Sequence, residues 1–307
     1  MSENVIVIAG PTASGKSALS LDLAQSFNGV IINADASQVY QGIPIISAAP
    51  SADDKRIAEH RLYEYLDPSV NGNVFNWLND AVINIREVWN KNQIPIIVGG
   101  GGLYLDNLIK GTTPIPDILP NVRNLALEII NQSGVEKLYE YLRRDDPKGA
   151  AMVNQNDETR VRRAWEIFSS TGKSISEWYK LPMVQKLPEA RFITLKIEPL
   201  KKDLDMRCNM RFDYMLQSGA IDEVKYLISR NLSPELPAMR AKGVPELITY
   251  LKNIITLDEA AELAKLHTRQ YAKRQLTWFR NKFKADFMSD KCYNHQQDFI
   301  NYVKKTL

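Results

Sequence analysis

The stretch Gly10–Ser17 (GPTASGKS) combines residue types and a spacing that can bind a phosphate group. Its two glycines, at positions 10 and 15, are followed by Lys16 and Ser17, which satisfies the pattern GxxxxGK[ST]. Glycine lets the backbone turn so tightly that its N–H groups point inward, and a helix that starts after such a loop adds its positive dipole end. Lys16 would supply a cation, and Ser17 a hydroxyl ligand for Mg²⁺. The residues expected to bind a diphosphate or a nucleotide are Gly10, Pro11, Thr12, Ala13, Ser14, Gly15, Lys16 and Ser17.

Asp35 is the acid best placed to act beside this loop. It follows the apolar run Val30–Ile32, whereas the apolar run Ile96–Val98 ends in four glycines and offers no acid. An ATPase would use an acid at the end of such a strand to hold magnesium. If Asp35 instead acts as a base on an acceptor, the loop could hold the diphosphate of any donor. The residues alone leave open which phosphate compound is bound.

Residues 265–284 (KLHTRQYAKRQLTWFRNKFK) contain seven lysines and arginines and no acid. On a helix they form two neighbouring stripes, one apolar and one basic. A solvated face normally mixes charges of both signs, whereas a run of one sign suits the phosphate backbone of a nucleic acid. The apolar stripe consists of Ala272, Leu276, Phe279 and Phe283, and the basic stripe of Arg269, Lys273, Arg280 and Lys284.

Three further arginines, at positions 160, 162 and 163, follow Asn156-Asp157. Asparagine and aspartate favour the cap position of a helix. The arginines would therefore present cations at the start of a helix.

The elements that must position these residues alternate between strand and helix. The short β-branched run Val5–Ala9 precedes the loop, an amphipathic helix starts at Lys16, and Val30–Ile32 is a second buried strand. This order is typical of a βαβ unit. With the further strands expected at 95–98 and 191–197, the sequence predicts an α/β fold. The expected core is a mostly parallel, P-loop NTPase-like sheet with helices on both faces.

The core is interrupted in the middle of the chain. Thr112–Pro120 contains three prolines and is typical of a hinge, and residues 121–189 show helical patterns without a convincing strand. We therefore expect three segments: 1–115 as the first part of the core, 116–189 as a helical insertion domain, and 190–307 as the second part of the core with basic C-terminal helices.

The composition argues against a disulfide-rich secreted protein, a soft-metal protein and a membrane protein. The two cysteines lack CxxC spacing, the three histidines are scattered, and the net charge is +3. No soft-metal site is expected, and a reduced, cytoplasmic compartment is the natural interpretation. The N-terminus lacks the pattern of a signal peptide, and the chain has no run of 18 apolar residues. We expect the protein to be a monomer and not to associate with a membrane.

Six stretches, in order along nearly the whole chain, resemble the tRNA dimethylallyltransferases (isopentenyl-diphosphate:tRNA transferases). They are GPTASGKS (10–17), NADASQVYQG (33–42), VGGGGLYL (98–105), DPKGAAMVNQNDETRVRRAWEIFSSTGKSIS (146–176), MRCNMRFDYMLQSGAIDEVKYL (206–227) and TRQYAKRQLTWFR (268–280). The last is the most diagnostic. The resemblance implies transfer of a dimethylallyl group from dimethylallyl diphosphate to N6 of the adenosine 3′ to the anticodon (position 37 of the tRNA), in tRNAs that read codons beginning with U. The loop would then hold the diphosphate of the isoprenoid, with Mg²⁺, and the anticodon stem-loop would be the partner.

The resemblance also implies roles for individual residues. Asp35 would accept the proton of the adenine amine, and Thr12 and Arg211 would complete the catalytic set. Arg207 lies four residues before Arg211, so one helix face would present both to the diphosphate. The residues expected to contact tRNA are Asp35, Ala36, Ser37, Gln38, Gly101, Arg160, Val161, Arg162, Arg163, Arg269, Lys273, Arg274, Gln275, Trp278 and Arg280.

Several positions depart from the family pattern, and two alternatives follow. Ala36 and Ser37 stand where the family usually has Ser-Arg, Ala49 replaces a lysine, and Gly101 replaces a threonine. One alternative is a non-catalytic RNA-binding paralogue, which would bind tRNA without prenyl transfer. The other is a small-molecule P-loop kinase, which shares the loop and the early aspartate but leaves the basic segment 265–284 unexplained.

Overall fold

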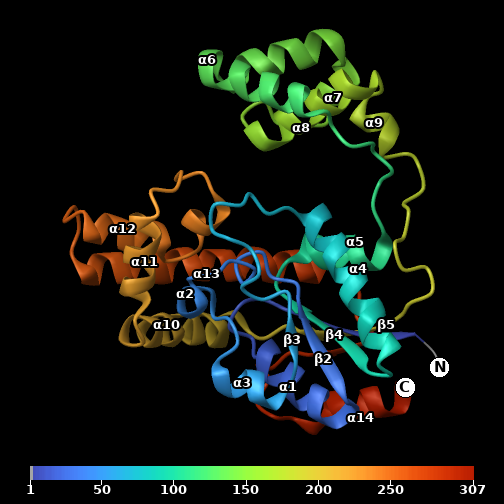
Figure 1. Ribbon diagram of the computed structural model, residues 1–307, viewed down its shortest axis with the longest axis vertical. Helices are drawn as coiled ribbons and strands as arrows, with labels where there is room; N and C mark the ends of the chain where they lie inside the picture. Colours follow the sequence, from blue (N-terminus) through green and yellow to red (C-terminus); the bar gives the residue numbers. More distant parts are fainter. Residues whose placement is uncertain (1–2) are drawn as a thin grey trace. The chain divides into compact units, whose positions relative to one another are not determined.

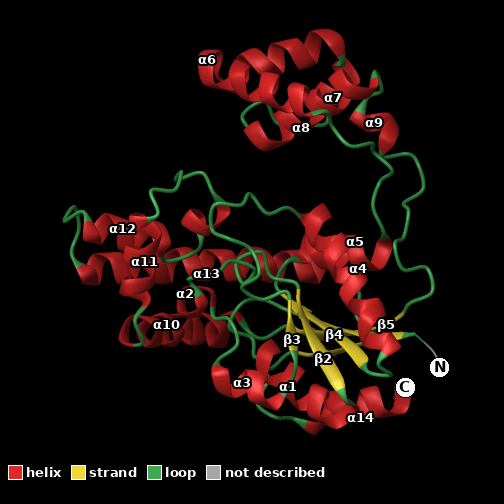
Figure 2. Ribbon diagram, viewed as in Figure 1, coloured by secondary structure: helices red, strands yellow, loops and turns green. Residues whose placement is uncertain are grey.

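The computed structural model describes residues 3–307, which build one sheet of six strands in the order β3-β2-β4-β1-β5-β6. Every neighbouring pair of strands is parallel, so the prediction of a mostly parallel α/β core is confirmed. Figures 1 and 2 show the sheet with helices around it. The strands are β1 (Asn4–Ala9), β2 (Gly29–Asn33), β3 (His60–Arg61), β4 (Ile94–Gly99), β5 (Arg191–Ile197) and β6 (Phe287–Ser289).

Helices cover both faces of the sheet because side chains alternate between the faces along each strand. In β1, Val5 and Val7 belong to the cluster formed with α4 (Val74–Asn90) and α5 (Gly102–Lys110). Ile6 and Ile8 belong to the opposite cluster, with α1 (Lys16–Phe27) and α14 (Gln297–Thr306). Both faces are thus apolar, which explains why the central strands are continuous runs of hydrophobic residues.

A third apolar cluster, the helical cluster, lies beside the sheet and is built mainly from helices. The long helix α13 joins this cluster to the sheet: its first turns pack in the helical cluster through Ala260 and Ala264, and its last turn packs under the sheet through Phe279. Residues in the middle of α13 therefore lie between the helical cluster and the sheet, where the functional site is found. The helices around the helical cluster are α2 (Pro44–Ser47), α10 (Lys201–Gln217), α11 (Ala220–Ser229), η1 (Pro237–Arg240), α12 (Val244–Leu251) and α13 (Leu257–Lys282), while α3 (Ala52–Ile57) precedes β3.

Residues 110–186 form a separate compact unit, and the rest of the chain forms the other. The expected insertion bounds of 116–189 lie a few residues later at both ends. The unit is helical and has its own core, which includes Leu138, Val161 and Ile167. Gly134, at φ 79° and ψ 168°, interrupts its first helix. The helices are α6 (Pro120–Asp145), α7 (Pro147–Ala150), α8 (Glu158–Thr171) and α9 (Ile175–Trp178).

Sequence patterns did not predict the two edge strands, β3 and β6, because two or three residues are too few for a period to be recognised. Tertiary contacts hold β6 instead: Asp286 accepts hydrogen bonds from the backbone and hydroxyl of Thr194, both at 2.7 Å. Within the described part of the chain, residues 3–307, no helix has the length and apolarity needed to cross a membrane.

Candidate active site

The phosphate loop joins β1 to α1 and encloses the ammonium group of Lys16, whose Nζ donates a 2.7 Å hydrogen bond to the carbonyl of Pro11. Gly15 has a left-handed backbone with φ 98°, and a Cβ at this position would lie 2.8 Å from the carbonyl oxygen of Tyr293. The backbone N–H of Tyr293 donates in turn to the carbonyl of Ser14 at 2.9 Å. Glycine at position 15 thus meets both a conformational and a steric requirement.

The eight loop residues divide into a lining set and a buried set. Thr12, Ala13, Gly15, Lys16 and Ser17 line a cavity of about 370 Å³. The remaining three, Gly10, Pro11 and Ser14, are buried behind the loop backbone.

Burial lowers the pKa of Lys16 to about 8, with Asp35 opposing and Arg211 reinforcing the shift. Below pH 8 the amine is charged and can bind an anion, and above it the charge is lost. We therefore expect the affinity for inorganic diphosphate, measured by calorimetry, to fall by up to about tenfold per pH unit above pH 8. Lys16→Arg keeps its charge and should show no such fall. Equal pH profiles for the two proteins between pH 7 and 9.5 would contradict the assignment.

Asp35 lies two residues beyond β2, and the side chain of Asn33 holds its backbone in place. Asn33 Oδ1 accepts from the Asp35 N–H at 2.8 Å, and Asn33 Nδ2 donates to the Asp35 carbonyl at 3.0 Å. One carboxylate oxygen, Asp35 Oδ1, accepts from the backbone N–H of Ser37 at 2.9 Å. Asn33 is fully buried, so this bracket fixes where the carboxylate points. Sequence reasoning missed Asn33, although it lies only two residues before Asp35 in the stretch 33–42.

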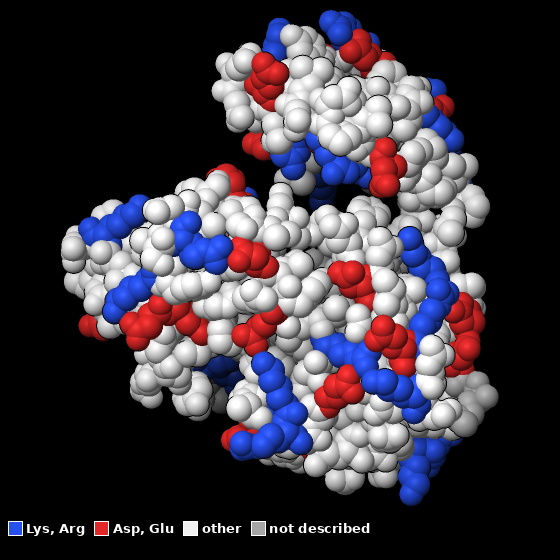
Figure 3. All heavy atoms as spheres, in the orientation of Figure 1, with Lys and Arg blue, Asp and Glu red and all other residues white. Residues whose placement is uncertain are grey.

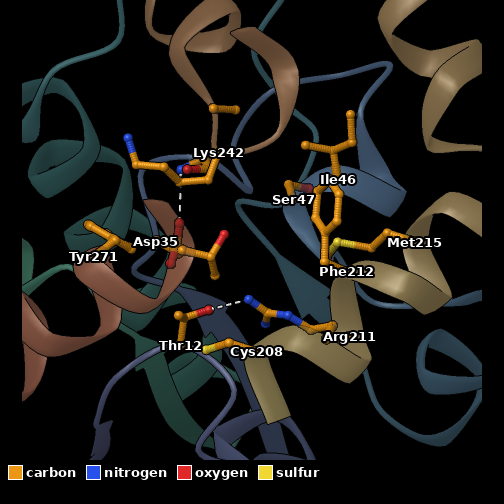
Figure 4. Close-up of a pocket in the computed structure, with 13 residues that line it drawn as sticks. Thr12, Asp35, Ile46, Ser47, Cys208, Arg211, Phe212, Met215, Lys242 and Tyr271 are labelled. Carbon is orange, nitrogen blue, oxygen red and sulfur yellow. Dashed lines mark hydrogen bonds between the residues drawn. The ribbon is translucent and has the colours of Figure 1, made fainter. Parts of the chain in front are cut away.

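Two cavities meet at Asp35. The loop lines the larger one, and the smaller one, of about 50 Å³, lies between α2, α10 and α13. Figure 4 shows the smaller cavity, with Lys242 and Tyr271 on one side, Ile46 and Phe212 on the other, and a hydrogen bond from Arg211 to the hydroxyl of Thr12 below. A group held by the phosphate loop and a group in the smaller cavity would therefore meet beside the carboxylate. The residues that line both cavities are Thr12, Asp35, Ser47 and Arg211.

Arg207 and Arg211 both lie on α10 and both line the larger cavity, as their spacing predicted. Arg211 also reaches the smaller cavity. Burial lowers the pKa of Arg211, which Cys208 and Asp35 nearby partly offset. Its guanidinium therefore lies in a weakly solvated position, where an anion would gain most from it. Sequence reasoning did not identify Lys242 or Tyr271, because their places in the cavity wall depend on how α12 and α13 pack.

Two predicted tRNA contacts, Gln275 and Val161, are buried, and a third, Gly101, lies outside both cavities. Gln275 is 6% exposed, accepts from the Thr12 N–H at 2.8 Å and donates to the Gly100 carbonyl at 2.9 Å. It braces the phosphate loop, so the prediction that it binds tRNA is wrong. Gly101 lies outside both cavities, with the Ala34 carbonyl 2.8 Å from where its Cβ would be. Val161 is fully buried in the core of the helical unit, so that prediction is also wrong.

Of the three residues that follow Asp35, two line a cavity. Ala36 is exposed, and Ser37 lines the smaller cavity. Gln38 lines the larger cavity, but its Nε2 donates to the carbonyls of Ser47 at 3.1 Å and Ala48 at 2.6 Å. Its amide nitrogen therefore supports the cavity wall.

The basic stripe is less uniform than the sequence indicated. Arg280 donates to Glu198 at 2.9 Å, and Arg269 donates to Asn209 at 2.5 Å, so other elements engage both. Lys284 follows the end of α13 at Lys282. Figure 3 shows basic and acidic side chains intermingled on the face in view. A basic groove of one sign nevertheless runs along α13, lined by Gln270, Lys273, Arg274, Thr277, Trp278, Asn281 and Lys282.

Trp278 both packs against neighbouring residues and lines the groove. Its ring lies against Gly102, whose Cβ would be 2.4 Å from Cε3, and it packs edge-on against Phe279 at 5.3 Å between centroids. It also lines the groove along α13 and is only half-buried.

The cations of the helical unit lie at the start of α8. Asp157 caps this helix, as its sequence position suggested, by accepting from the Arg160 N–H at 3.1 Å. Arg160 pairs with Asp157 at 3.3 Å and Arg162 with Glu166 at 3.6 Å. Burial lowers the pKa of Arg163.

The protein groups at the loop fit a magnesium ion that is held mainly by water and by the phosphate oxygens of a bound compound. Ser17 is exposed in the same cavity as Lys16 and Asp35. Among residues 3–307, no cluster of three or more His, Cys, Asp or Glu side chains could hold a metal. Mg²⁺ commonly keeps waters and phosphate oxygens and takes only one or two ligands from the protein.

Comparison with known proteins gives one consistent family. A family model described as IPP transferase matches residues 38–282. A tRNA dimethylallyltransferase of Rhodopseudomonas palustris (strain BisB18) is 44% identical over 277 residues, covering 90% of this chain and 88% of that protein. The tRNA dimethylallyltransferase of Bradyrhizobium sp. (strain ORS 278) is 42% identical over 283 residues, covering 92% of both proteins.

Solved structures give the same result. A eukaryotic dimethylallyltransferase acting on tRNA matches with a TM-score of 0.82 at 30% identity, covering 98% of this chain and 77% of that chain. A tRNA isopentenylpyrophosphate transferase from Bacillus halodurans matches with a TM-score of 0.69 at 33% identity, covering 99% and 95% of the two chains.

Proposed function

The chain belongs to the IPP transferase family, and from this premise we propose that it transfers a dimethylallyl group from dimethylallyl diphosphate to N6 of an adenosine in tRNA. We further propose that this adenosine lies 3′ to the anticodon, in tRNAs that read codons beginning with U. The observation that carries the proposal is the meeting of a phosphate-loop cavity and a second cavity at one carboxylate, Asp35.

In this reaction the bond between C1 of the donor and the diphosphate oxygen breaks, and the diphosphate leaves with the electron pair. A bond forms between C1 and adenine N6, and Asp35 accepts the proton released from N6. Adenine N6 is too weak an acid to be deprotonated first, so the proton transfer accompanies bond formation. Lys16 and Arg211 stabilise the charge that develops on the diphosphate.

Magnesium is part of this proposal. Ser17 would hold the ion, which would neutralise charge on the bound diphosphate. The ion would add to the cations of Lys16, Arg207 and Arg211 at the same cavity.

The acceptor adenosine must leave the stack of its loop to reach Asp35. We propose that the groove along α13 binds the RNA backbone near the anticodon, and that Arg160, Arg162 and Arg163 of the helical unit provide a second set of contacts. This division matches the chemistry of RNA recognition, in which cations bind phosphates and an aromatic ring such as that of Trp278 can stack on an unpaired base.

Lys273→Glu should weaken tRNA binding about tenfold at physiological salt, because it reverses one phosphate-facing charge in the groove. Filter binding across a salt series should also show a smaller dependence on salt. Affinity for dimethylallyl diphosphate should be unchanged. Lys304→Glu on α14 is a matched control, since Lys304 is exposed on a helix that packs on α1. Equal tRNA affinities for the two variants would remove the groove from the RNA interface.

The experiment that tests the function is direct. The purified protein is incubated with magnesium, dimethylallyl diphosphate and unmodified bulk tRNA, and the digested nucleosides are analysed by mass spectrometry. We expect N6-(dimethylallyl)adenosine from the native protein. Intact tRNA binding without this product would indicate a non-catalytic RNA-binding protein, and ATP hydrolysis or phosphoryl transfer would indicate a kinase.

A further inference from the structure

The C-terminal segment 287–307 lies between the edge of the sheet and the helix that follows the phosphate loop. We call it the C-terminal strap. Its strand β6 pairs with β5, and its helix α14 packs on α1, as Figure 1 shows. Between these two elements the strap passes the phosphate loop, where Tyr293 contacts Ser14 and Gly15. The end of the chain therefore supports a loop that lies near its beginning.

The phosphate loop keeps several backbone N–H groups for a ligand. Inward-pointing N–H groups are what such a loop offers to a diphosphate, so the orientation of each peptide group affects binding. These groups donate to no acceptor among residues 3–307 and belong to Ala13, Gly15, Lys16 and Ser17.

Tyr293 determines the direction of one of these groups, the N–H of Gly15. The backbone N–H of Tyr293 donates to the carbonyl of Ser14 at 2.9 Å. The Ser14 carbonyl and the Gly15 N–H belong to the same planar peptide group and point in opposite directions. Because the carbonyl faces Tyr293, the N–H of Gly15 faces away from the strap. Gly15 also lines the larger cavity, and a Cβ on it would lie 2.9 Å from the Cβ of Tyr293.

Asp22 of α1 holds Tyr293 in this place. The hydroxyl of Tyr293 donates to Asp22 Oδ2 at 2.8 Å, and Nδ1 of His295 lies 2.7 Å from the same oxygen. Tyr293 is 2% exposed, and its ring packs edge-on against Phe299 of α14 with 5.8 Å between centroids. Burial and the hydrogen bond to Asp22 raise the pKa of Tyr293, so its hydroxyl stays protonated and can donate.

We propose that Tyr293 is a positioning residue for the donor: it fixes the phosphate loop so that the N–H of Gly15 points at the diphosphate, and Asp22 fixes Tyr293. This inference rests on the proposed function only for the identity of the compound that carries the diphosphate. Inorganic diphosphate contains the group that the loop would bind, so its binding tests the inference separately from prenyl transfer.

Tyr293→Phe removes the bond to Asp22, and Tyr293→Ala also removes the ring beside Gly15. Calorimetry with magnesium should show that the Kd for inorganic diphosphate rises about threefold in the first variant and about tenfold or more in the second. The KM for dimethylallyl diphosphate should rise in the same order. Affinity for tRNA should stay at its native value, because it does not depend on the N–H groups of the loop.

Two changes elsewhere in the strap are matched controls. Val303→Ala removes a fully buried side chain of α14, so it should lower the temperature of unfolding without changing the affinity for diphosphate. Tyr302→Phe removes the hydroxyl of a half-buried tyrosine of α14 and should change neither quantity.

The outcomes separate positioning from stability. Native diphosphate affinity in a folded Tyr293→Ala protein would overturn the proposal, as would equal losses of affinity in Tyr293→Ala and Val303→Ala. If thermal unfolding shows that Tyr293→Ala does not fold, Tyr293→Phe decides alone, and its native affinity overturns the proposal. A native protein that binds diphosphate in this pattern without prenyl transfer would reject the proposed function and support the role of Tyr293.

A double-mutant cycle tests whether Asp22 acts through Tyr293. Asp22→Ala should raise the Kd for diphosphate about threefold, and the double variant with Tyr293→Phe should show the same loss of about threefold. A loss of about ninefold, the product of two independent effects, would show that Asp22 does not act through this hydroxyl. Asp298→Ala, which changes an exposed aspartate of α14, is the control and should leave the affinity native.

Discussion

Asp35→Asn is expected to lower kcat for tRNA prenylation by about 10³-fold, while the affinities for tRNA and for dimethylallyl diphosphate stay within about threefold of the native values. Asparagine keeps the shape of the side chain, and its Oδ1 can still accept the hydrogen bond from the N–H of Ser37. What it loses is the ability to take the proton that adenine N6 releases as the new bond forms. Single-turnover kinetics with saturating donor and tRNA measures this step directly.

The matched control is Asp53→Asn, which neutralises an exposed aspartate of α3. It should leave the single-turnover rate unchanged. A near-native rate for Asp35→Asn would refute the role of Asp35 as the base. A lost rate accompanied by lost tRNA affinity would indicate that Asp35 contributes mainly to acceptor binding.

Arg211→Ala is expected to lower kcat by about 10²–10³-fold, the usual cost of removing one group that stabilises developing charge. The guanidinium lines both cavities and bonds to the hydroxyl of Thr12, so it lies where the leaving diphosphate gains charge. Its partial desolvation strengthens this interaction relative to one in open water. Rapid-quench measurement of the chemical step, together with calorimetry of donor binding, separates the effect on rate from the effect on affinity.

Arg207→Ala is the informative comparison, because Arg207 lines only the larger cavity. It should weaken donor binding several-fold and change the chemical step little. Arg211→Lys should recover part of the rate by restoring a positive charge without the planar fork of donors. Equal losses of rate in the two alanine variants would contradict the distinction drawn between these arginines.

Much of the core could be predicted from local sequence. The apolar runs that became β1, β2 and β4 are buried on both faces, and so are residues 193–197 of β5. These patterns could be recognised because a strand buried on both faces is hydrophobic at nearly every position. The phosphate loop was recognisable because its function depends on the backbone of consecutive residues. Arg207 and Arg211 were correctly paired because the helical period places them on one face.

Predictions failed where a side chain's role depends on a distant partner. Gln275 lies among lysines and arginines in the sequence and was assigned to tRNA, yet it bonds to Thr12 and Gly100. Val161 stands between arginines but packs in a core. Arg280 belongs to a stretch without acids, yet Glu198 of another segment neutralises it.

The sequence by itself determined the family, the phosphate loop, the position of Asp35 beside it and most strands of the core, because each is encoded by neighbouring residues in a recognisable local pattern. Only the tertiary structure decided that Asn33 brackets Asp35, that Gln275 braces the loop, and that Glu223 accepts hydrogen bonds from the backbone of Ile45 and Ile46. The last two contacts join segments more than 170 residues apart. Such contacts arise from the packing of α11 and α13 against the loops, and no local period or motif specifies which buried polar group will meet which backbone atom.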